Sequence, residues 1–334
     1  MKNTAGSINY NPNGRGVPAV FSGEGMPNML TGRFAPSPSG RMHLGNVFSA
    51  LLAWLSVRSR NGRMLLRIED LDPDRCRPDY IEMLKRDLDW LGLDWDEEQT
   101  PQSMRADDYH AEFERLRALG LVYPCYCSRA ELHAASAPHA SDGNVIYAGT
   151  CRSLTEAERA AKIRKPAWRV IVPDTVITVQ DGLQGAYSEN LARDCGDFII
   201  RRSDGVYAYQ LAVVTDDAAG GVTEVIRGRD LLSSVPRQMW LQKTLGFPTP
   251  AYYHVPLLLA PDGRRLSKRE KSLDLGALRE RCTPEQLVGT LAFLAGLQPE
   301  PAPAAPAALV SGFAWKNVQS DNVVIHSEFG CDIS

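Results

Sequence analysis

Three groups of residues in this chain of 334 residues have types and spacings that could do chemistry. The first centres on His43, which lies in a short loop between Gly40 and Gly45, directly before a stretch with helical spacing. Backbone N–H groups at the start of a helix are unpaired and can bind phosphate. A loop histidine is by default a surface residue, but a glycine beside it lets the backbone approach a ligand closely. We therefore expect a phosphate-binding loop here.

The second group is a cationic run around Lys268, in which five Lys and Arg residues fall between Arg264 and Lys271. Such a run is ordinarily a solvated turn. Cations on a loop can also stabilise the negative charge of a transferred or departing phosphate group. Together with His43, the pair Ser267-Lys268 therefore indicates a second phosphate-directed loop.

The third group consists of Cys125, Cys127 and Cys151, which could supply three thiolates to a zinc ion. A fourth ligand is needed. By chemistry alone a histidine between them, His133 or His139, is preferable to the phenol of Tyr147, and water is a further alternative. An odd total of seven cysteines suits a reducing compartment with a metal site better than a disulfide framework.

The elements that must position these groups read as a nucleotide-binding α/β sheet. An apolar strand over residues 29–35 is cut off by Pro36 and Pro38, a helix is expected over 46–58, and a buried strand over 64–68 leads into Glu69. A strand, a glycine-bearing loop that opens a helix, and a parallel strand form half of such a sheet.

Further along the chain, helical patterns cover residues 79–91, 103–119, 234–245 and 276–295. Strands are expected at 121–123, 222–226 and 253–259. Residues 168–172 and 176–179 look like a β pair, and 198–201 with 207–214 look like a hairpin around the turn 203–205. The Pro/Ala run 299–308 predicts a stiff, extended linker.

The run RFAPSPSG, followed by HLGN and RIED, resembles the first signature of class I aminoacyl-tRNA synthetases in its glutamyl form. The sequence RLSKR at 265–269 resembles the KMSKS loop of that family, with Arg265 in place of the leading Lys. The resemblance covers about residues 31–293. It implies an α/β fold: a class I, HUP-type Rossmann catalytic domain with a zinc-bearing insertion and a short helical C-terminal piece, and no anticodon-binding domain.

The same resemblance implies the roles of individual residues. His43 and Lys268 would be catalytic, and ATP would be bound by His43, Gly45, Asn46, Ser267 and Lys268. Asn46 stands where the family has Gly or His. The glutamate pocket would be lined by Arg33, Phe34, Ala35, Pro36, Ser37, Glu69, Tyr209 and Arg227.

The pattern C-x-C…Y-x-x-x-C further resembles the glutamyl-queuosine tRNA(Asp) synthetases, a shortened paralogous family whose zinc is held by three Cys and one Tyr. This implies one structural Zn²⁺ per chain on Cys125, Cys127, Tyr147 and Cys151. It also implies activation of L-glutamate with ATP and Mg²⁺, and transfer of glutamate to the queuosine base of tRNA(Asp). The alternative is a truncated glutamyl-tRNA synthetase that charges a tRNA 3′ end.

The expected organisation is a disordered tail at 1–28, a first catalytic half at 29–123, a zinc-bearing insertion at 124–194, a second catalytic half at 195–272, and a helical C-terminal region at 273–334. A net charge of −3 argues against general affinity for nucleic acid but permits a local basic face. No apolar run is long enough for a bilayer, which favours a cytoplasmic protein with no membrane partner. A monomer is also expected. The first strand is not followed by G-x-G-x-x-G, which argues against a Rossmann oxidoreductase. A non-catalytic relative would lack His43, Glu69 or Lys268, and all three are present.

Overall fold

The computed structural model describes residues 29–128, 131, 146–264, 266 and 273–325. Predictions made for other residues lie outside this part of the chain. They concern the tail 1–28, the alternative zinc ligands His133 and His139, the loop residues Arg265, Ser267 and Lys268, and residues 326–334.

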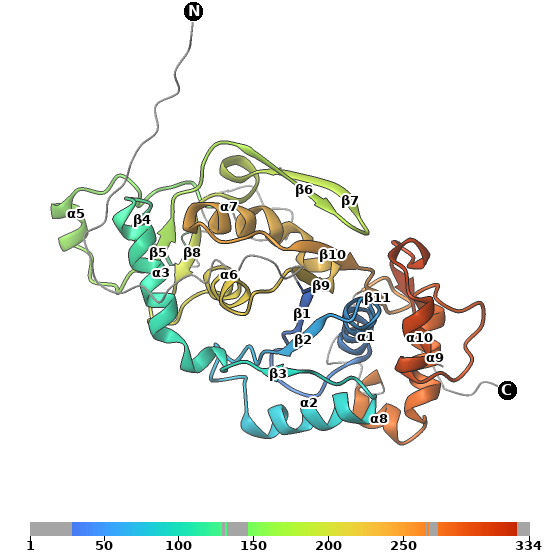
Figure 1. The fold of residues 1–334 in the computed structure, drawn as a ribbon. Coiled ribbons are helices and arrows are strands. Elements are labelled where there is room, and N and C mark those ends of the chain that lie inside the picture. Colours follow the sequence, from blue (N-terminus) through green and yellow to red (C-terminus); the bar gives the residue numbers. More distant parts are fainter. Residues whose placement is uncertain (1–28, 129–130, 132–145, 265, 267–272, 326–334) are drawn as a thin grey trace, which may run out of the picture.

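The main sheet is built on parallel strands that are brought together from two distant parts of the chain (Figure 1). One group comprises β1 (Thr31–Phe34), β2 (Arg63–Leu66) and β3 (Glu97–Glu98), and the other comprises β9 (Glu224–Gly228) and β10 (Ala251–Val255). The backbone N–H of Thr223 donates to the carbonyl of Thr31 at 2.9 Å, which places β9 beside β1. The strands therefore follow in the order β3-β2-β1-β9-β10. Strands β2 and β3 are added on one side of β1, and β9 and β10 are added on the other side. Open α/β sheets bind ligands at such a switch point.

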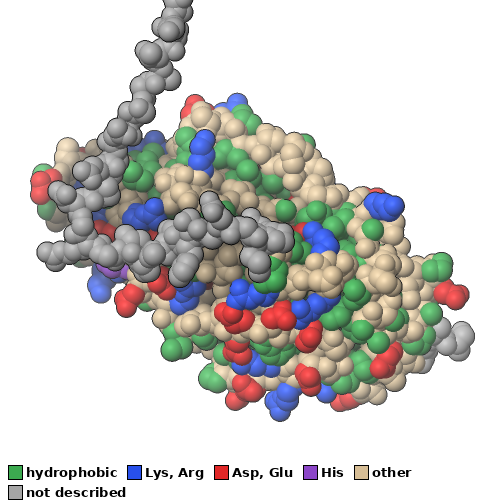
Figure 2. Space-filling view, in the orientation of Figure 1, with side chains coloured by type: hydrophobic (Ala, Val, Ile, Leu, Met, Phe, Trp, Pro, Cys, Tyr) green, Lys and Arg blue, Asp and Glu red, His purple; other side chains and the backbone are tan. Residues whose placement is uncertain are grey.

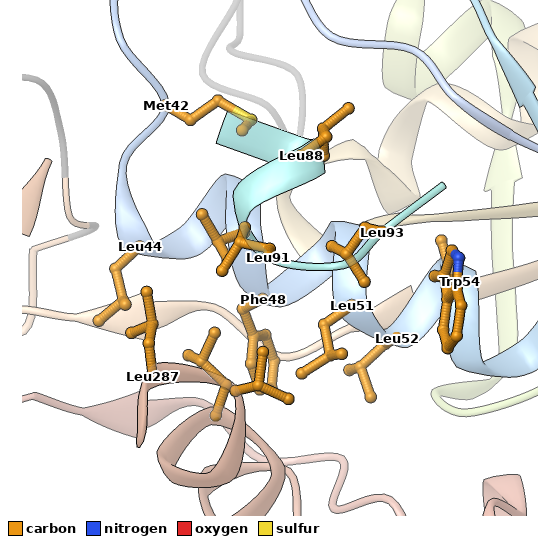
Figure 3. Packing of buried hydrophobic residues seen from close by; sticks show 14 of the residues in the cluster. Met42, Leu44, Phe48, Leu51, Leu52, Trp54, Leu88, Leu91, Leu93 and Leu287 are labelled. Carbon is orange, nitrogen blue, oxygen red and sulfur yellow. The ribbon is translucent and has the colours of Figure 1, made fainter. Parts of the chain in front are cut away.

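Helix α1 (Leu44–Arg58) connects β1 to β2 and carries the largest apolar core. Figure 3 shows Leu44 next to Leu287 of α9 (Pro284–Leu294), with Leu91 and Leu93, which follow α2 (Pro78–Trp90), packed over α1. Burying each such side chain contributes roughly 1.5–3 kcal/mol. This packing fixes the N-terminus of α1 at the carboxyl end of the sheet.

A second core surrounds α3 (Ala106–Ala118), α6 (Tyr209–Ala219) and α7 (Val235–Leu245). Beside it lies an antiparallel sheet in the order β4-β5-β8, made of β4 (Val122–Cys125), β5 (Ala167–Val170) and β8 (Phe198–Arg201). The short helix α5 (Glu156–Ala160) lies at this end of the molecule (Figure 1). Short helical turns occupy Gln102–Met104, Leu191–Cys195, Arg229–Ser234, Val310–Gly312 and Trp315–Asn317.

Two of the predicted strand pairings are wrong. The segment 207–214 bridges to β8 only at Tyr207 and then becomes α6, because its apolar run is buried on all sides of a helix and such a run looks the same in a strand. Residues 168–172 and 176–179 do not pair with each other. Instead β5 lies between β4 and β8, and β6 (Val176–Asp181) forms a hairpin with β7 (Gly185–Asn190).

The C-terminal region is also more closely packed than predicted. The helical stretch 276–295 is two helices, α8 (Leu275–Arg279) and α9, which are separated where Thr283 caps α9. The Pro/Ala run is not a free linker, because the backbone N–H of Ala304 donates to the carbonyl of Glu285 at 2.9 Å and Pro306 is buried at the start of α10 (Pro306–Leu309). A strand that the sequence did not reveal, β12 (Val323–Val324), pairs in parallel with β11 (Leu258–Leu259).

None of the helices in the described residues is long and apolar enough to cross a membrane. On the face that Figure 2 shows, positive and negative side chains lie intermixed. Five of the six described cysteines form no disulfide bond, whereas Cys282 is disulfide-bonded.

Candidate active site and metal centre

A cavity of about 500 Å³ opens at the carboxyl ends of β1 and β9, where the order of the sheet reverses. Its wall contains every described residue for which a role in binding ATP or glutamate was predicted: Arg33, Phe34, Ala35, Pro36, Ser37, His43, Gly45, Asn46, Glu69, Tyr209 and Arg227. Leu266 lines the same cavity, whereas Ser267 and Lys268 lie outside the described residues. The structure thus brings together the described residues of the predicted site, which come from distant parts of the chain.

The His43 loop is fixed by a reciprocal cap at the start of α1. The ring Nδ1 of His43 accepts from the N–H of Gly45 at 3.1 Å, and the N–H of His43 donates to Oδ1 of Asn46 at 3.1 Å. Because Nδ1 acts as an acceptor, the proton of the neutral ring lies on Nε2, where it is a donor. Asn46, the departure from the family pattern, therefore completes the cap of this helix.

Arg33 enters the cavity floor from β1 and is only 5% exposed. Its Nη1 donates to the carbonyl of Ile226 at 3.2 Å, which is the only hydrogen bond that its guanidinium makes to the described residues. The Nε lies 3.5 Å from Oδ1 of Asp217. Burial lowers the pKa of Arg33, although Asp217 opposes this shift. A buried arginine with unused N–H groups indicates an anionic ligand.

Glu69 follows β2 and lies beside this arginine. Its Oε1 accepts from Nη2 of Arg67 at 3.1 Å, and its backbone N–H donates to the carbonyl of Pro36 at 3.0 Å. Burial raises the pKa of Glu69, while Arg67 and Arg33 counteract the shift. The carboxylate is thus held in a cationic surrounding at the edge of the cavity.

Arg227 approaches from β9 and Tyr209 from the N-terminus of α6. Nη1 of Arg227 donates to the phenolic oxygen of Tyr209 at 3.3 Å, and Nη2 donates to Oε1 of Gln238 at 2.9 Å. Burial raises the pKa of Tyr209. Two guanidinium groups, from β1 and β9, therefore face one cavity, whose wall also contains the carboxylates Glu69 and Asp230.

A second, smaller cavity of about 360 Å³ adjoins the first. Both cavities are lined by Ser37, Ser39, Glu69 and Tyr209. The rest of its lining includes the polar residues Asp72, Arg75, Gln102, Arg202 and Tyr207. The sequence did not indicate this cavity, because its residues come from loops whose meeting depends on the fold.

The predicted zinc ligands also meet. The sulfur atoms of Cys125, Cys127 and Cys151 all lie within 4.8 Å of one another, with Cys127 and Cys151 3.5 Å apart. The phenolic oxygen of Tyr147 lies 3.5 Å from the sulfur of Cys125 and 3.8 Å from that of Cys127. Ligands about 2.3 Å from a tetrahedral zinc ion are about 3.8 Å apart, so this set of donors fits the metal.

Around these four residues lie groups that favour an anionic ligand set. Nε of Arg169 donates to the sulfur of Cys125 at 3.3 Å, and its guanidinium lies 3.8 Å from the centre of the Tyr147 ring. The backbone N–H of Tyr126 donates to the sulfur of Cys151 at 3.5 Å. Such outer contacts orient metal ligands and stabilise their charge.

Sequence reasoning missed several residues that support the site. Asp217 and Arg67 hold Arg33 and Glu69, and His254 contacts Arg227. Arg67 belongs to the segment RIED of the family signature, so a signal existed for this residue. None pointed to His254, which could be found only from its place beside β9.

Known proteins with similar sequences and structures point to one family. The family model of the class I tRNA synthetase (E and Q) catalytic domain matches residues 29–304. The chain is 51% identical over 291 residues to a glutamyl-Q tRNA(Asp) synthetase of Nitratidesulfovibrio vulgaris, with 83% of this chain and 90% of that protein covered. It is 48% identical over 315 residues to the protein of the same name in Symbiobacterium thermophilum, with 90% and 97% covered.

Among solved structures, the chain is similar to a glutamate tRNA ligase from Elizabethkingia meningosepticum in complex with its amino acid. The TM-score is 0.76 at 26% identity, and the match covers 90% of this chain and 67% of that chain. A glutamate-tRNA synthetase from Elizabethkingia anophelis matches with a TM-score of 0.77. These matches confirm the predicted fold class, a mixed α/β catalytic domain of the class I type.

Proposed function

Because the chain belongs to the glutamyl-Q tRNA(Asp) synthetases, a family of class I tRNA synthetases and hence of ligases, we propose that it activates L-glutamate with ATP and transfers the glutamyl group to the queuosine base in the anticodon of tRNA(Asp). The observation that carries this proposal is the single cavity in which two buried arginines, Arg33 and Arg227, face the capped start of α1. Such a cavity suits an amino acid with two carboxylates beside a nucleotide.

In the proposed first step, the α-carboxylate oxygen of glutamate attacks the α-phosphorus of ATP in line. A new bond forms between that oxygen and phosphorus, the α–β phosphoanhydride bond breaks, and pyrophosphate leaves with its electron pair. No protein nucleophile is needed, since positioning and charge stabilisation suffice. Mg²⁺ would supply neutralisation of phosphate charge when bound.

Within this step, His43 would donate from Nε2 to a phosphate oxygen while the backbone of Gly45 allows close approach. Ser267 and Lys268, which lie outside the described residues, keep their predicted role of stabilising the departing pyrophosphate. Arg33 and Arg227 would hold the carboxylates of glutamate, and Glu69 would accept from its ammonium group. Aspartate is one methylene too short, and glutamine lacks the charge that an arginine pairs with, so both would be poorer substrates.

In the second step, a hydroxyl oxygen of the acceptor attacks the glutamyl carbonyl carbon. An ester bond forms, the bond from the carbonyl carbon to the phosphate oxygen breaks, and AMP leaves while the hydroxyl proton is lost. The smaller cavity supports this step, because it adjoins the larger cavity at Glu69 and Tyr209. Its polar side chains could bind a polar acceptor group. A base with hydroxyl groups would enter there.

We further propose that Cys125, Cys127, Tyr147 and Cys151 hold one structural Zn²⁺. Their spacing and the contacts of Arg169 support this assignment. Four protein donors leave no open position for a substrate, which favours a structural role. The division into catalytic halves at 29–123 and 195–272, with the metal-bearing segment between them, remains part of the proposal.

The decisive experiment is transfer of labelled glutamate to three purified RNAs: tRNA(Asp) with queuosine, tRNA(Asp) without it, and tRNA(Glu). We expect label only on the first, and expect it to survive removal of the 3′ end. Label on tRNA(Glu) that is lost with the 3′ end would instead make the protein a compact glutamyl-tRNA synthetase. If no RNA is labelled and glutamate-dependent exchange between ATP and pyrophosphate is also absent, both readings are overturned.

A further inference from the structure

We propose that Asp181 and His254 form a positioning relay that holds the guanidinium of Arg227 in its binding orientation and thereby sets the affinity for glutamate. This inference rests on the proposed function, because it takes Arg227 as a ligand of the substrate. The relay joins the turn of the β6–β7 hairpin to β10 and, through it, to β9.

His254 lies in β10 with its side chain fully buried between the other two residues. Its Nε2 is 3.0 Å from Nε of Arg227, and its Nδ1 is 2.5 Å from Oδ2 of Asp181. The guanidinium Nε–H can only donate, so Nε2 must accept. The proton of the ring therefore lies on Nδ1 and is donated to Asp181.

Asp181 is held as an acceptor on its other oxygen as well. Oδ1 accepts from the backbone N–H groups of Leu183 at 3.0 Å, Gln184 at 2.8 Å and His254 at 3.2 Å. Gly182 has no room for a side chain, because a Cβ there would lie 2.1 Å from the Tyr253 ring. The hairpin turn is thus pressed against β10, and its carboxylate selects the tautomer of the histidine.

The remaining N–H groups of Arg227 explain why this selection matters. Nη2 donates to Gln238 and to the carbonyl of Leu231, and Nη1 donates to Tyr209. With His254, the described residues use four of the five guanidinium N–H groups. The fifth, on Nη1, is left for a ligand in the cavity. The orientation of that donor depends on all four supports, and the Nε support is the one reached through Asp181.

An isosteric change separates this role from a merely structural one. In Asp181→Asn, the amide oxygen would keep the three backbone N–H groups, and the amide nitrogen would face Nδ1 as a donor. The ring proton would then move to Nε2 and point at the N–H of Arg227. Two donors would face each other, and Arg227 would turn away from the substrate.

The test measures glutamate-dependent exchange between ATP and pyrophosphate, which needs no RNA. For Asp181→Asn we expect the KM for glutamate to rise about tenfold or more, because losing one hydrogen bond to a charged group weakens binding by about that factor. The KM for ATP should stay within about twofold of the wild-type value. The matched control is Asp174→Asn, which removes an exposed carboxylate at the other end of the same hairpin and should leave both constants unchanged.

Introducing Asp181→Asn into a second variant, His254→Gln, separates the proposed relay from a folding defect. In His254→Gln, the side-chain oxygen can accept from Arg227 whatever residue occupies position 181, so this variant should bind glutamate within about threefold of wild type. Adding Asp181→Asn in that background should change the KM by less than about twofold. An equal loss in both backgrounds would mean that Asp181 acts only on the hairpin, and the relay would be wrong.

The tautomer can be read directly from ¹⁵N-labelled histidine by NMR, with the His254 signal assigned by its loss in His254→Gln. We expect the proton on Nδ1 in wild type and on Nε2 in Asp181→Asn. A proton on Nε2 in wild type would overturn the relay even if exchange activity is normal. Absence of exchange in wild type, with the proton on Nδ1, would instead overturn the proposed function and leave the geometry of the relay intact.

Discussion

Nη1 of Arg67 lies 2.6 Å from Oδ1 of Asp217, and this buried pair joins β2 to α6 across 150 positions of the chain. Asp217 also lies 3.5 Å from Nε of Arg33, and Nη2 of Arg67 contacts Glu69. Although burial opposes it, the neighbouring carboxylates raise the pKa of Arg67, and Asp217 comes first among them. The two parts of the chain that form the main sheet, the two halves, are therefore held together by the same charges that position the cavity residues.

Replacing Arg67 with Met should destabilise the fold by about 3–5 kcal/mol, because buried carboxylates would lose their cation. The free energy of unfolding in urea measures this loss. The control is Asp204→Asn, which breaks the Arg202–Asp204 pair, whose side chains are each about half exposed, and should cost at most about 1 kcal/mol. A loss below about 1 kcal/mol for Arg67→Met would show that the buried cluster does not hold the halves together.

His43 has a structural and a chemical role that two substitutions separate. His43→Ala removes the cap and should cost about 1 kcal/mol of stability, whereas His43→Asn keeps a capping side chain and should nearly preserve it. Both remove the Nε2 donor and should lower kcat for exchange by about 10²–10³. Thermal unfolding and exchange kinetics measure the two effects. Normal kcat in His43→Asn would leave this histidine only its role as a cap.

The proposed zinc site predicts one equivalent of zinc by elemental analysis of the purified protein. Cys127→Ser should lose the metal, and Tyr147→Phe should release it faster to a chelator because one donor is gone. Cys76→Ser is the control, since this free thiol lies outside the cluster. If His139→Ala releases zinc and Tyr147→Phe does not, the histidine is the fourth ligand.

The free energy of unfolding should fall as the pH is lowered through a range set by the pKa of His254. Burial lowers the pKa of this ring from 6.5 to about 4, against the opposing effect of Asp181. Between these two pH values the unfolded chain binds more protons than the folded one, so stability drops as the pH falls from 6.5 toward 4 and is unaffected by this group above 6.5. The full loss is about 3 kcal/mol. Urea unfolding of wild type and His254→Gln at several pH values should differ by this slope, and equal slopes would contradict the prediction.

Local patterns were sufficient for the first half of the sheet. Turn residues and apolar spacing placed β1, α1, β2 and α2 within a few residues, because Pro36, Gly45 and the pair Asn61-Gly62 act on the backbone next to them. The same reasoning took α6 for a strand and paired β5 with β6. The first error arose because the apolar residues of α6 are buried around the helix, so that periodicity disappears. The second arose because β5 pairs with β4 and β8, which lie far from it in the sequence, and a local pattern does not show which strands pair.

What the sequence by itself determined is the set of chemical groups. The histidine loop and the three cysteines are recognisable from residue type and near neighbours, and the two arginines and the glutamate are indicated by the resemblance to the family. What only the tertiary structure decided is which of them meet, and what holds them. His254 meets Asp181 across 73 positions and Arg227 across 27, and Arg67 meets Asp217 across 150. Contacts over such distances follow from the packing of whole strands and helices, which no local pattern encodes.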